Sequence, residues 1–179
     1  MLHPKGAVAT QRLFFALWPE PALQQRVALA AMALLPRADG RWVREENLHC
    51  TLVFLGAVEA AQRLCLEDAA SLVRVEPFTL VLDRMGYFRR PQAAWLGCTT
   101  TPAALQALVA GLSYGATSCG FPPEQRPYEV HLTVARKLRR DPGRMPLLPI
   151  AWQVHQFALM ESVSTADGVQ YRPLRFWDL

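Results

Sequence analysis

Two short stretches that share the pattern histidine, any residue, threonine, apolar residue constrain this chain more than any other feature. They are His49–Leu52 and His131–Val134, and each lies within a run of β-favouring residues. Because side chains alternate between the two faces of a strand, the histidine and threonine of each stretch share a face. Around the first stretch, the same alternation turns four side chains toward a core: Leu48, Cys50, Leu52 and Phe54. The sequence therefore predicts two strands that each present one His-Thr pair.

The segments that precede the two stretches also match. Pro21 opens a helical pattern 28 positions before His49, and Pro102 opens another 29 positions before His131. A short β-like run comes before each proline. This order indicates an internal duplication of strand, helix and His-x-Thr strand. We therefore expect two related lobes, each contributing one His-Thr pair.

Strand-forming segments outnumber helical ones along the chain. We expect strands at 12–18, 48–55, 77–87, 94–98, 128–138, 151–164 and 170–177. We expect helices from about 21 to 35, 59 to 74 and 102 to 116. This irregular alternation indicates an α+β fold with mainly antiparallel sheets rather than a doubly wound parallel sheet. The proline-rich segment 141–149 is expected to be a linker, and 1–179 to form a single domain of two intertwined lobes.

Basic residues are grouped rather than spread evenly over a chain of net charge +4. The groups are Arg89 and Arg90, and then Arg136, Lys137, Arg139, Arg140 and Arg144. Such groups raise the local concentration of polyanions. They favour a phosphate-bearing partner, and a solvated basic face is the alternative.

Hydrophobic runs and cysteines indicate the compartment. No apolar stretch approaches the roughly 20 residues that cross a bilayer, and the first residues lack the apolar centre of a secretory signal. We therefore expect a cytoplasmic protein with no membrane partner. Cys50, Cys65, Cys98 and Cys119 show no CxxC spacing, so we expect free, mostly buried thiols. Strand alternation turns Cys50 toward the core, which argues against a nucleophilic role.

Two histidines suit acid-base chemistry near neutral pH, since one ring accepts a proton while the other donates one. A threonine hydroxyl beside each ring can hold a phosphate oxygen. Zinc normally takes three or four His, Cys or carboxylate ligands, and neither stretch has such partners nearby. We expect no metal and no cofactor. The structural alternative is a pair of histidines that serve only as hydrogen-bonded members of a sheet.

The two stretches and their flanks resemble the two-histidine phosphoesterase superfamily, and within it the bacterial RNA 2′,3′-cyclic phosphodiesterase branch. The resemblance runs from Arg12 to Trp177 and rests on RLFFALWP, RWVREENLHCTLVFLG, LDRMGYFRRP and RPYEVHLTVARK. It implies a bilobal α+β fold with a pseudo-twofold axis. Two mainly antiparallel sheets would flank a central cleft, with helices outside and both motifs facing each other across the cleft.

The resemblance also implies roles for single residues. His49 would be the acid that protonates the departing O3′, and His131 the base that activates water. Thr51 and Thr133 would bind the phosphate oxygens. Arg136 would also bind phosphate, although strict alternation puts it on the face opposite His131, so the strand must twist, bulge or end before it. Phe14 matches an aromatic residue of the family's first strand, which predicts a stacking contact with the substrate.

Three functions follow as alternatives. The first is metal-independent hydrolysis of RNA 2′,3′-cyclic phosphate ends to 2′-phosphates. The second is a 2′-5′ RNA ligase that joins tRNA halves with the same residues. The third is a binding module that holds nucleotides or RNA ends without turnover. In each case we expect RNA with a cyclic phosphate end, or a nucleotide cyclic phosphate, as the partner. We expect a monomer with no obligate protein partner.

Overall fold

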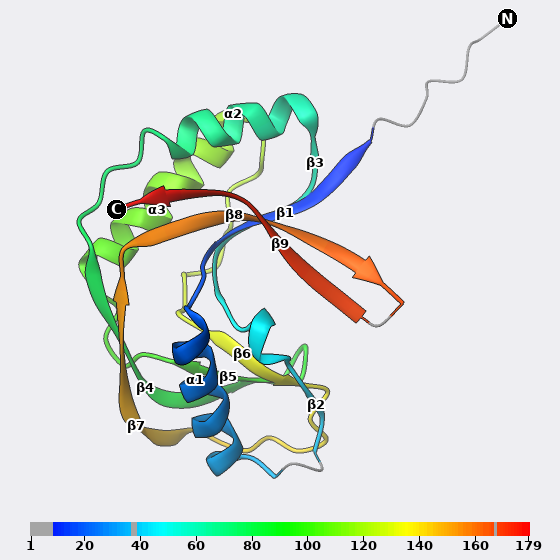
Figure 1. Ribbon diagram of the computed structural model, residues 1–179, viewed down its shortest axis with the longest axis vertical. Coiled ribbons are helices and arrows are strands. Elements are labelled where there is room, and N and C mark those ends of the chain that lie inside the picture. Colours follow the sequence, from blue (N-terminus) through cyan, green and yellow to red (C-terminus); the bar gives the residue numbers. More distant parts are fainter. Residues whose placement is uncertain (1–8, 37–38, 167) are drawn as a thin grey trace, which may run out of the picture.

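The computed structural model describes residues 9–36, 39–166 and 168–179, whose arrangement is shown in Figure 1. In chain order the elements are β1 (Thr10–Leu17), α1 (Pro21–Leu34), β2 (Arg41–Trp42), the 3-10 helix η1 (Glu45–Asn47), β3 (Cys50–Glu59), α2 (Ala60–Ala70), β4 (Phe78–Phe88), β5 (Ala93–Gly97), α3 (Ala103–Ser118), β6 (Leu132–Arg136), β7 (Met145–Val154), β8 (Gln156–Thr165) and β9 (Gly168–Asp178). Among these residues no helix is long and apolar enough to span a bilayer.

The strands form one hydrogen-bonded sheet in the order β7-β4-β5-β6-β3-β1-β8-β9, with β2 added beside β6. Neighbouring strands in this order are paired antiparallel. The two halves of the sheet meet where β3 and β6 pair through Cys50 and Leu132. The expected α+β fold with antiparallel pairing is confirmed, and the two expected sheets are joined at this single residue pair.

The two halves repeat the same order outward from the junction. β3 is followed by β1 in one half, and β6 by β5 in the other. The helix after β1 and the helix after β5 each pack on the opposite half, since α1 contacts β7 and α3 contacts β3 (Figure 1). This exchange agrees with lobes that are intertwined. The single domain over 1–179 stays a prediction.

Buried apolar residues form one large cluster between the sheet and its helices, and a small second cluster on the other face. The second cluster contains Phe14, Ala16, Ala158 and Met160, with Trp18 and Tyr171 packed against it. It covers β1 and β8 on the face that also carries the His-Thr pair of β3. The site described below is therefore built on the face opposite the main core.

The segment expected to be a linker is part of a strand. β7 begins at Met145 and ends at Val154, and the chain then bends at His155 before β8. β7 is the outermost strand of its half, so Pro146 and Pro149 remove no hydrogen bond that a further strand would need. The expected linker at 141–149 is therefore wrong for residues 145–149, which belong to β7. The expected strand at 151–164 is two strands, β7 and β8, divided at His155.

Two of the four cysteines form a disulfide rather than free thiols. Cys65 of α2 is bonded to Cys119, which directly follows α3, with a Cα–Cα distance of 5.9 Å. A Cβ atom at Gly115 would lie 2.9 Å from Cβ of Ala69, so this glycine allows α2 and α3 to pack closely. The sequence separation of 54 residues conceals the pair. Cys50 and Cys98 are free and buried, as expected.

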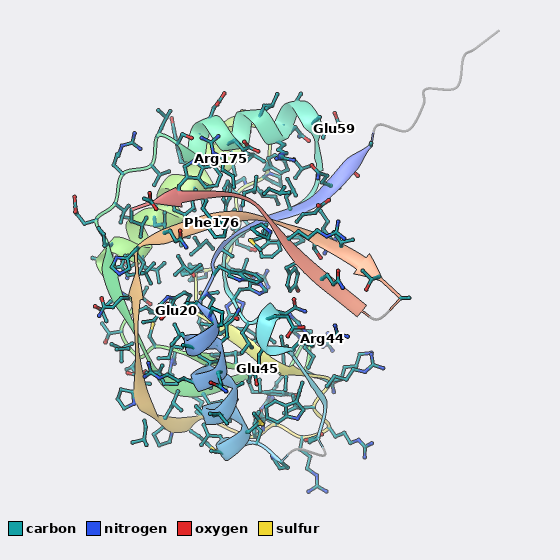
Figure 2. The ribbon with its side chains drawn as sticks, in the orientation of Figure 1. Glu20, Arg44, Glu45, Glu59, Arg175 and Phe176 are labelled. Carbon is teal, nitrogen blue, oxygen red and sulfur yellow. A yellow bond between two sulfur atoms is a disulfide. The ribbon has the colours of Figure 1, made fainter. Side chains whose placement is uncertain are left out.

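Polar contacts hold α2 in place over the sheet. Glu59 ends β3 and caps α2 (Figure 2). Its side chain accepts a hydrogen bond from the backbone N–H of Gln62, and its own backbone N–H donates to the Gln62 side chain. Arg175 of β9 lies 3.3 Å from the carboxylate of Glu67 in the same helix. These contacts connect the last strand to the motif strand β3 through α2.

Candidate active site

The two His-x-Thr stretches lie side by side at the centre of the sheet. Cys50 and Leu132, the pair that joins the two halves of the sheet, each directly follow one of the histidines. Continuing this antiparallel register by one position sets His49 opposite Thr133 and His131 opposite Thr51. The two histidines are then diagonal neighbours, which lie about 7–8 Å apart in a regular ladder. All four side chains are half-buried, so each remains accessible from the same face.

Each histidine ring is oriented by the same backbone contact. Nδ1 of His49 lies 2.7 Å from the carbonyl oxygen of Asn47, and Nδ1 of His131 lies 2.7 Å from that of Glu129. A carbonyl oxygen only accepts hydrogen bonds, so Nδ1 is the donor in both rings. In a neutral ring this leaves Nε2 unprotonated and able to accept a proton. Both rings therefore present Nε2 for proton transfer.

A β-bulge in β6 brings Arg136 to the face of the histidines. The register between β5 and β6 skips Val134, so that Val134 and Ala135 are both buried. One extra residue reverses the alternation of the side chains beyond it. Arg136 is accordingly exposed on the same face as His131. Its positive charge contributes to lowering the pKa of His49.

The equivalent bulge in β3 brings Phe54 to the same face. The register between β1 and β3 skips Leu52, and Phe54 pairs with Phe14. The Phe54 ring is 57% exposed, with the guanidinium carbon of Arg12 at 4.8 Å from its centroid. The expectation that Phe54 faces the core is wrong, because strict alternation ignores the bulge. Phe54 therefore occupies in β3 the place that Arg136 has in β6.

Three aromatic rings surround His49. Trp18 stacks on the imidazole at 5.5 Å between centroids, and Tyr171 meets it edge-on at 4.8 Å. Phe14 lies 5.0 Å from the imidazole, but it is only 3% exposed and also contacts Tyr171. A ring so fully covered has no free face for a nucleobase. This burial argues against the expected stacking of Phe14 on the substrate, and its observed contact is with His49.

Burial changes the acid-base behaviour of His49. Loss of solvent around the ring lowers the pKa of His49 from 6.5 to about 4. The hydrogen bond to the carbonyl of Asn47 raises this pKa, and the nearby charges of Arg136 and His131 lower it. His49 is thus neutral at neutral pH when no ligand is bound.

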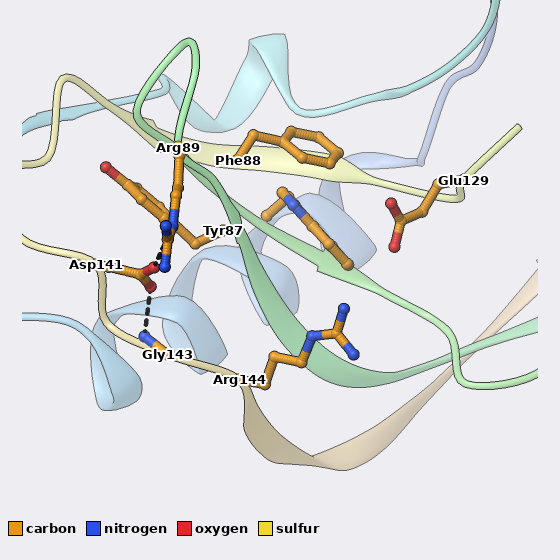
Figure 3. Close-up of a pocket in the computed structure, with 8 residues that line it drawn as sticks. Tyr87, Phe88, Arg89, Glu129, Asp141, Gly143 and Arg144 are labelled. Atoms are coloured by element: carbon orange, nitrogen blue, oxygen red, sulfur yellow. Dashed lines mark hydrogen bonds and ion pairs between the residues drawn. The ribbon is translucent and has the colours of Figure 1, made fainter. Parts of the chain in front are cut away.

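The surroundings of His131 differ from those of His49. The ring of Phe88 contacts His131 edge-on at 5.2 Å, and Trp95 lies behind Phe88 at 5.2 Å. Beyond them is a pocket of about 380 Å³, drawn in Figure 3. Its lining residues are Tyr87, Phe88, Arg89, Trp95, Glu129, Asp141, Gly143 and Arg144. The two histidines are therefore equivalent in backbone position and different in environment.

The floor of this pocket depends on a glycine. A Cβ atom at Gly86 would overlap the indole of Trp95, which lies across it. We expect Gly86→Ala to lower the free energy of unfolding by about 1–3 kcal/mol, because the buried indole must shift. Urea unfolding measures this change. In a Trp95→Leu background the same substitution should cost clearly less, and an equal cost in both backgrounds contradicts the overlap.

Tyr128 connects the two motifs, and sequence reasoning did not identify it. Its hydroxyl donates to the carbonyl oxygen of Thr51 at 3.2 Å and lies 3.4 Å from Sγ of Cys50. Burial raises the pKa of the Cys50 thiol to about 11, so this thiol stays protonated at neutral pH. Its environment agrees with the expectation that Cys50 is no nucleophile. In the sequence, only the closeness of Tyr128 to His131, three positions later, pointed to a place near the motifs.

Among the residues that the structure describes, no group of three or more His, Cys, Asp or Glu side chains is arranged to hold a metal ion.

Comparison with known proteins extends these observations. The model of the 2′-5′ RNA ligase superfamily matches residues 19–166. The RNA 2′,3′-cyclic phosphodiesterase of Escherichia coli (strain K12) is 32% identical over 174 residues, covering 94% of this chain and 97% of that protein. The RNA 2′,3′-cyclic phosphodiesterase of Archaeoglobus fulgidus is 27% identical over 177 residues, covering 93% and 99%.

Solved structures agree with the sequence matches. The crystal structure of E. coli LigT complexed with 3′-AMP superposes with a TM-score of 0.90 at 31% identity, covering 96% of this chain and 99% of that one. The apo form of the same protein gives a TM-score of 0.86. The resemblance inferred from the sequence motifs is thus confirmed. This chain belongs to the 2′-5′ RNA ligase superfamily.

Proposed function

We propose that this chain hydrolyses 2′,3′-cyclic phosphate ends of RNA to 2′-phosphates, with His49 and His131 as the acid-base pair and without a metal or cofactor. The observation that carries the proposal is the pairing of two rings, each held by a backbone carbonyl at Nδ1, on one accessible face. The names of the relatives from E. coli and A. fulgidus support the substrate.

In the proposed reaction His131 removes a proton from water, and the resulting oxygen attacks phosphorus. The bond between phosphorus and O3′ breaks, and His49 gives a proton to O3′. The hydroxyl groups of Thr51 and Thr133 donate hydrogen bonds to the non-bridging oxygens. The guanidinium of Arg136 stabilises the negative charge that builds up on these oxygens.

The low pKa of His49 sets a condition on this assignment, because an acid must be protonated when it acts. Burial and the positive charge of Arg136 keep the His49 ring neutral in the free protein. A bound phosphate anion offsets that positive charge and favours the protonated ring. We infer that His49 takes up its proton together with the substrate.

Both motifs belong to one chain, so the proposed site is complete without a partner subunit. On this basis we propose that the chain acts as a single-domain monomer, and that its place of action is the cytoplasm. Because a 5′-hydroxyl of a second RNA can replace water as the group that His131 deprotonates, with O3′ leaving as before, 2′-5′ ligation remains the second candidate. The superfamily model that matches the chain favours including it in the test.

Incubation with an RNA that ends in a 2′,3′-cyclic phosphate, in EDTA, tests the proposal. We expect a 2′-phosphate product at an unchanged rate, since no step uses a metal. A parallel sample with added 5′-hydroxyl RNA detects 2′-5′ joined product by its length. The proposal fails if no cyclic phosphate is consumed, if the product is a 3′-phosphate, or if EDTA stops turnover and zinc restores it.

A further inference from the structure

The pocket beside His131 has no role in the reaction described above. It opens next to Phe88, whose ring contacts His131, and it has a volume of about 380 Å³ (Figure 3). Phe88 and Tyr87 both line the pocket and are half-buried, and their side chains point to opposite faces of β4, with Phe88 on the face of His131. The pocket therefore continues the proposed active site in one direction.

Two of the residues that line this pocket carry a polar group that lacks a partner among the described residues. Arg144 is exposed, makes no hydrogen bond or ion pair there, and points into the pocket in Figure 3. By contrast, Arg89 lies 3.6 Å from the carboxylate of Asp141. The indole Nε1 of Trp95 is a buried donor with no hydrogen-bond partner. An unpaired cation and an unpaired donor beside aromatic rings are suited to a ligand that carries negative charge and a planar group.

A nucleotide has these two properties. The reacting phosphate lies between the histidines in the proposed reaction, so it does not need Arg144. A cation in this pocket therefore suits a second phosphate, and RNA provides one in the linkage to the preceding nucleotide. On the other side of the site, the exposed ring of Phe54 offers a separate surface for the terminal base.

We propose that this pocket binds the nucleotide that precedes the cyclic-phosphate end in an RNA strand. Its base lies against Phe88, and the internucleotide phosphate pairs with Arg144. This inference rests on the proposed function and extends it by one subsite, because it makes the protein prefer RNA strands to single cyclic nucleotides.

The test compares a dinucleotide that ends in a 2′,3′-cyclic phosphate with a mononucleoside 2′,3′-cyclic phosphate. The wild-type protein should have the higher kcat/KM for the dinucleotide. In Arg144→Gln the ratio of the two kcat/KM values should fall about tenfold, as for the loss of one charge-assisted contact. Arg140→Gln removes the same charge outside the pocket, and it should leave the ratio at the wild-type value.

Three results overturn the inference: no preference for the dinucleotide in the wild type, an unchanged ratio in Arg144→Gln, or an equal fall in both variants. Calorimetric Kd values for the dinucleotide and mononucleotide 2′-phosphate products make the same comparison without turnover, as a ratio of affinities. If neither cyclic phosphate is hydrolysed, the proposed function fails, and the Kd ratio alone still decides whether the pocket takes a second nucleotide.

Discussion

Replacing His131 or His49 with alanine is expected to lower kcat for RNA 2′,3′-cyclic phosphate hydrolysis about 10³-fold. Each ring transfers a proton in the proposed reaction, and a positioned acid or base contributes about 10²–10⁴-fold. The double variant should be little slower than either single variant, because the two groups act in the same step. Initial rates with an RNA of defined sequence measure all three.

His155→Ala is the matched control, since His155 is exposed and lies in the bend between β7 and β8. It should retain wild-type kcat. Circular dichroism and urea unfolding separate lost chemistry from lost folding, and His49→Gln adds a variant that fills more of the aromatic surroundings. If either alanine variant stays folded and keeps more than about a tenth of wild-type kcat, the acid-base pair is refuted.

Lowering the pH from 6.5 to 4 is expected to cost up to about 3 kcal/mol of unfolding free energy through His49 alone. Burial lowers the pKa of His49 to about 4 in the folded chain, against 6.5 for an unperturbed ring. Within this window the unfolded state binds more protons than the folded state, so stability rises with pH. The contribution is complete above pH 6.5 and is lost as the pH falls toward 4.

Urea unfolding at several pH values measures this loss, and His49→Gln is the control because it cannot titrate. As the pH falls, the wild type should lose more unfolding free energy than His49→Gln does. NMR titration of the His49 ring tests the same pKa directly, and a bound nucleoside 2′-phosphate should raise it. Parallel pH dependence in both proteins contradicts a buried, neutral His49.

Much of this molecule follows from local sequence pattern. Alternation and β propensity located the two His-x-Thr strands, and helical spacing after Pro21 and Pro102 located α1 and α3. These features depend on residues that are close in sequence, so they can be read without knowing the neighbours in space. The duplicated motif also predicted that two distant histidines meet, and the junction of β3 with β6 brings them together.

Other features depend on contacts between residues far apart in the chain. The bulges at Leu52 and Val134 arise from strand pairing, and they alone bring Phe54 and Arg136 to the face of the histidines. Contacts between distant residues also explain three further features: the burial of Phe14, the edge strand β7, and the disulfide between Cys65 and Cys119.

Propensity and alternation act locally, so the sequence is enough to predict the fold class, the two motif strands and the chemistry of their side chains. The side chains around each histidine follow from tertiary contacts: aromatic rings enclose His49, while Phe88 contacts His131 and lines a pocket. Register, bulges and burial are set by the neighbouring strands, which local sequence does not specify.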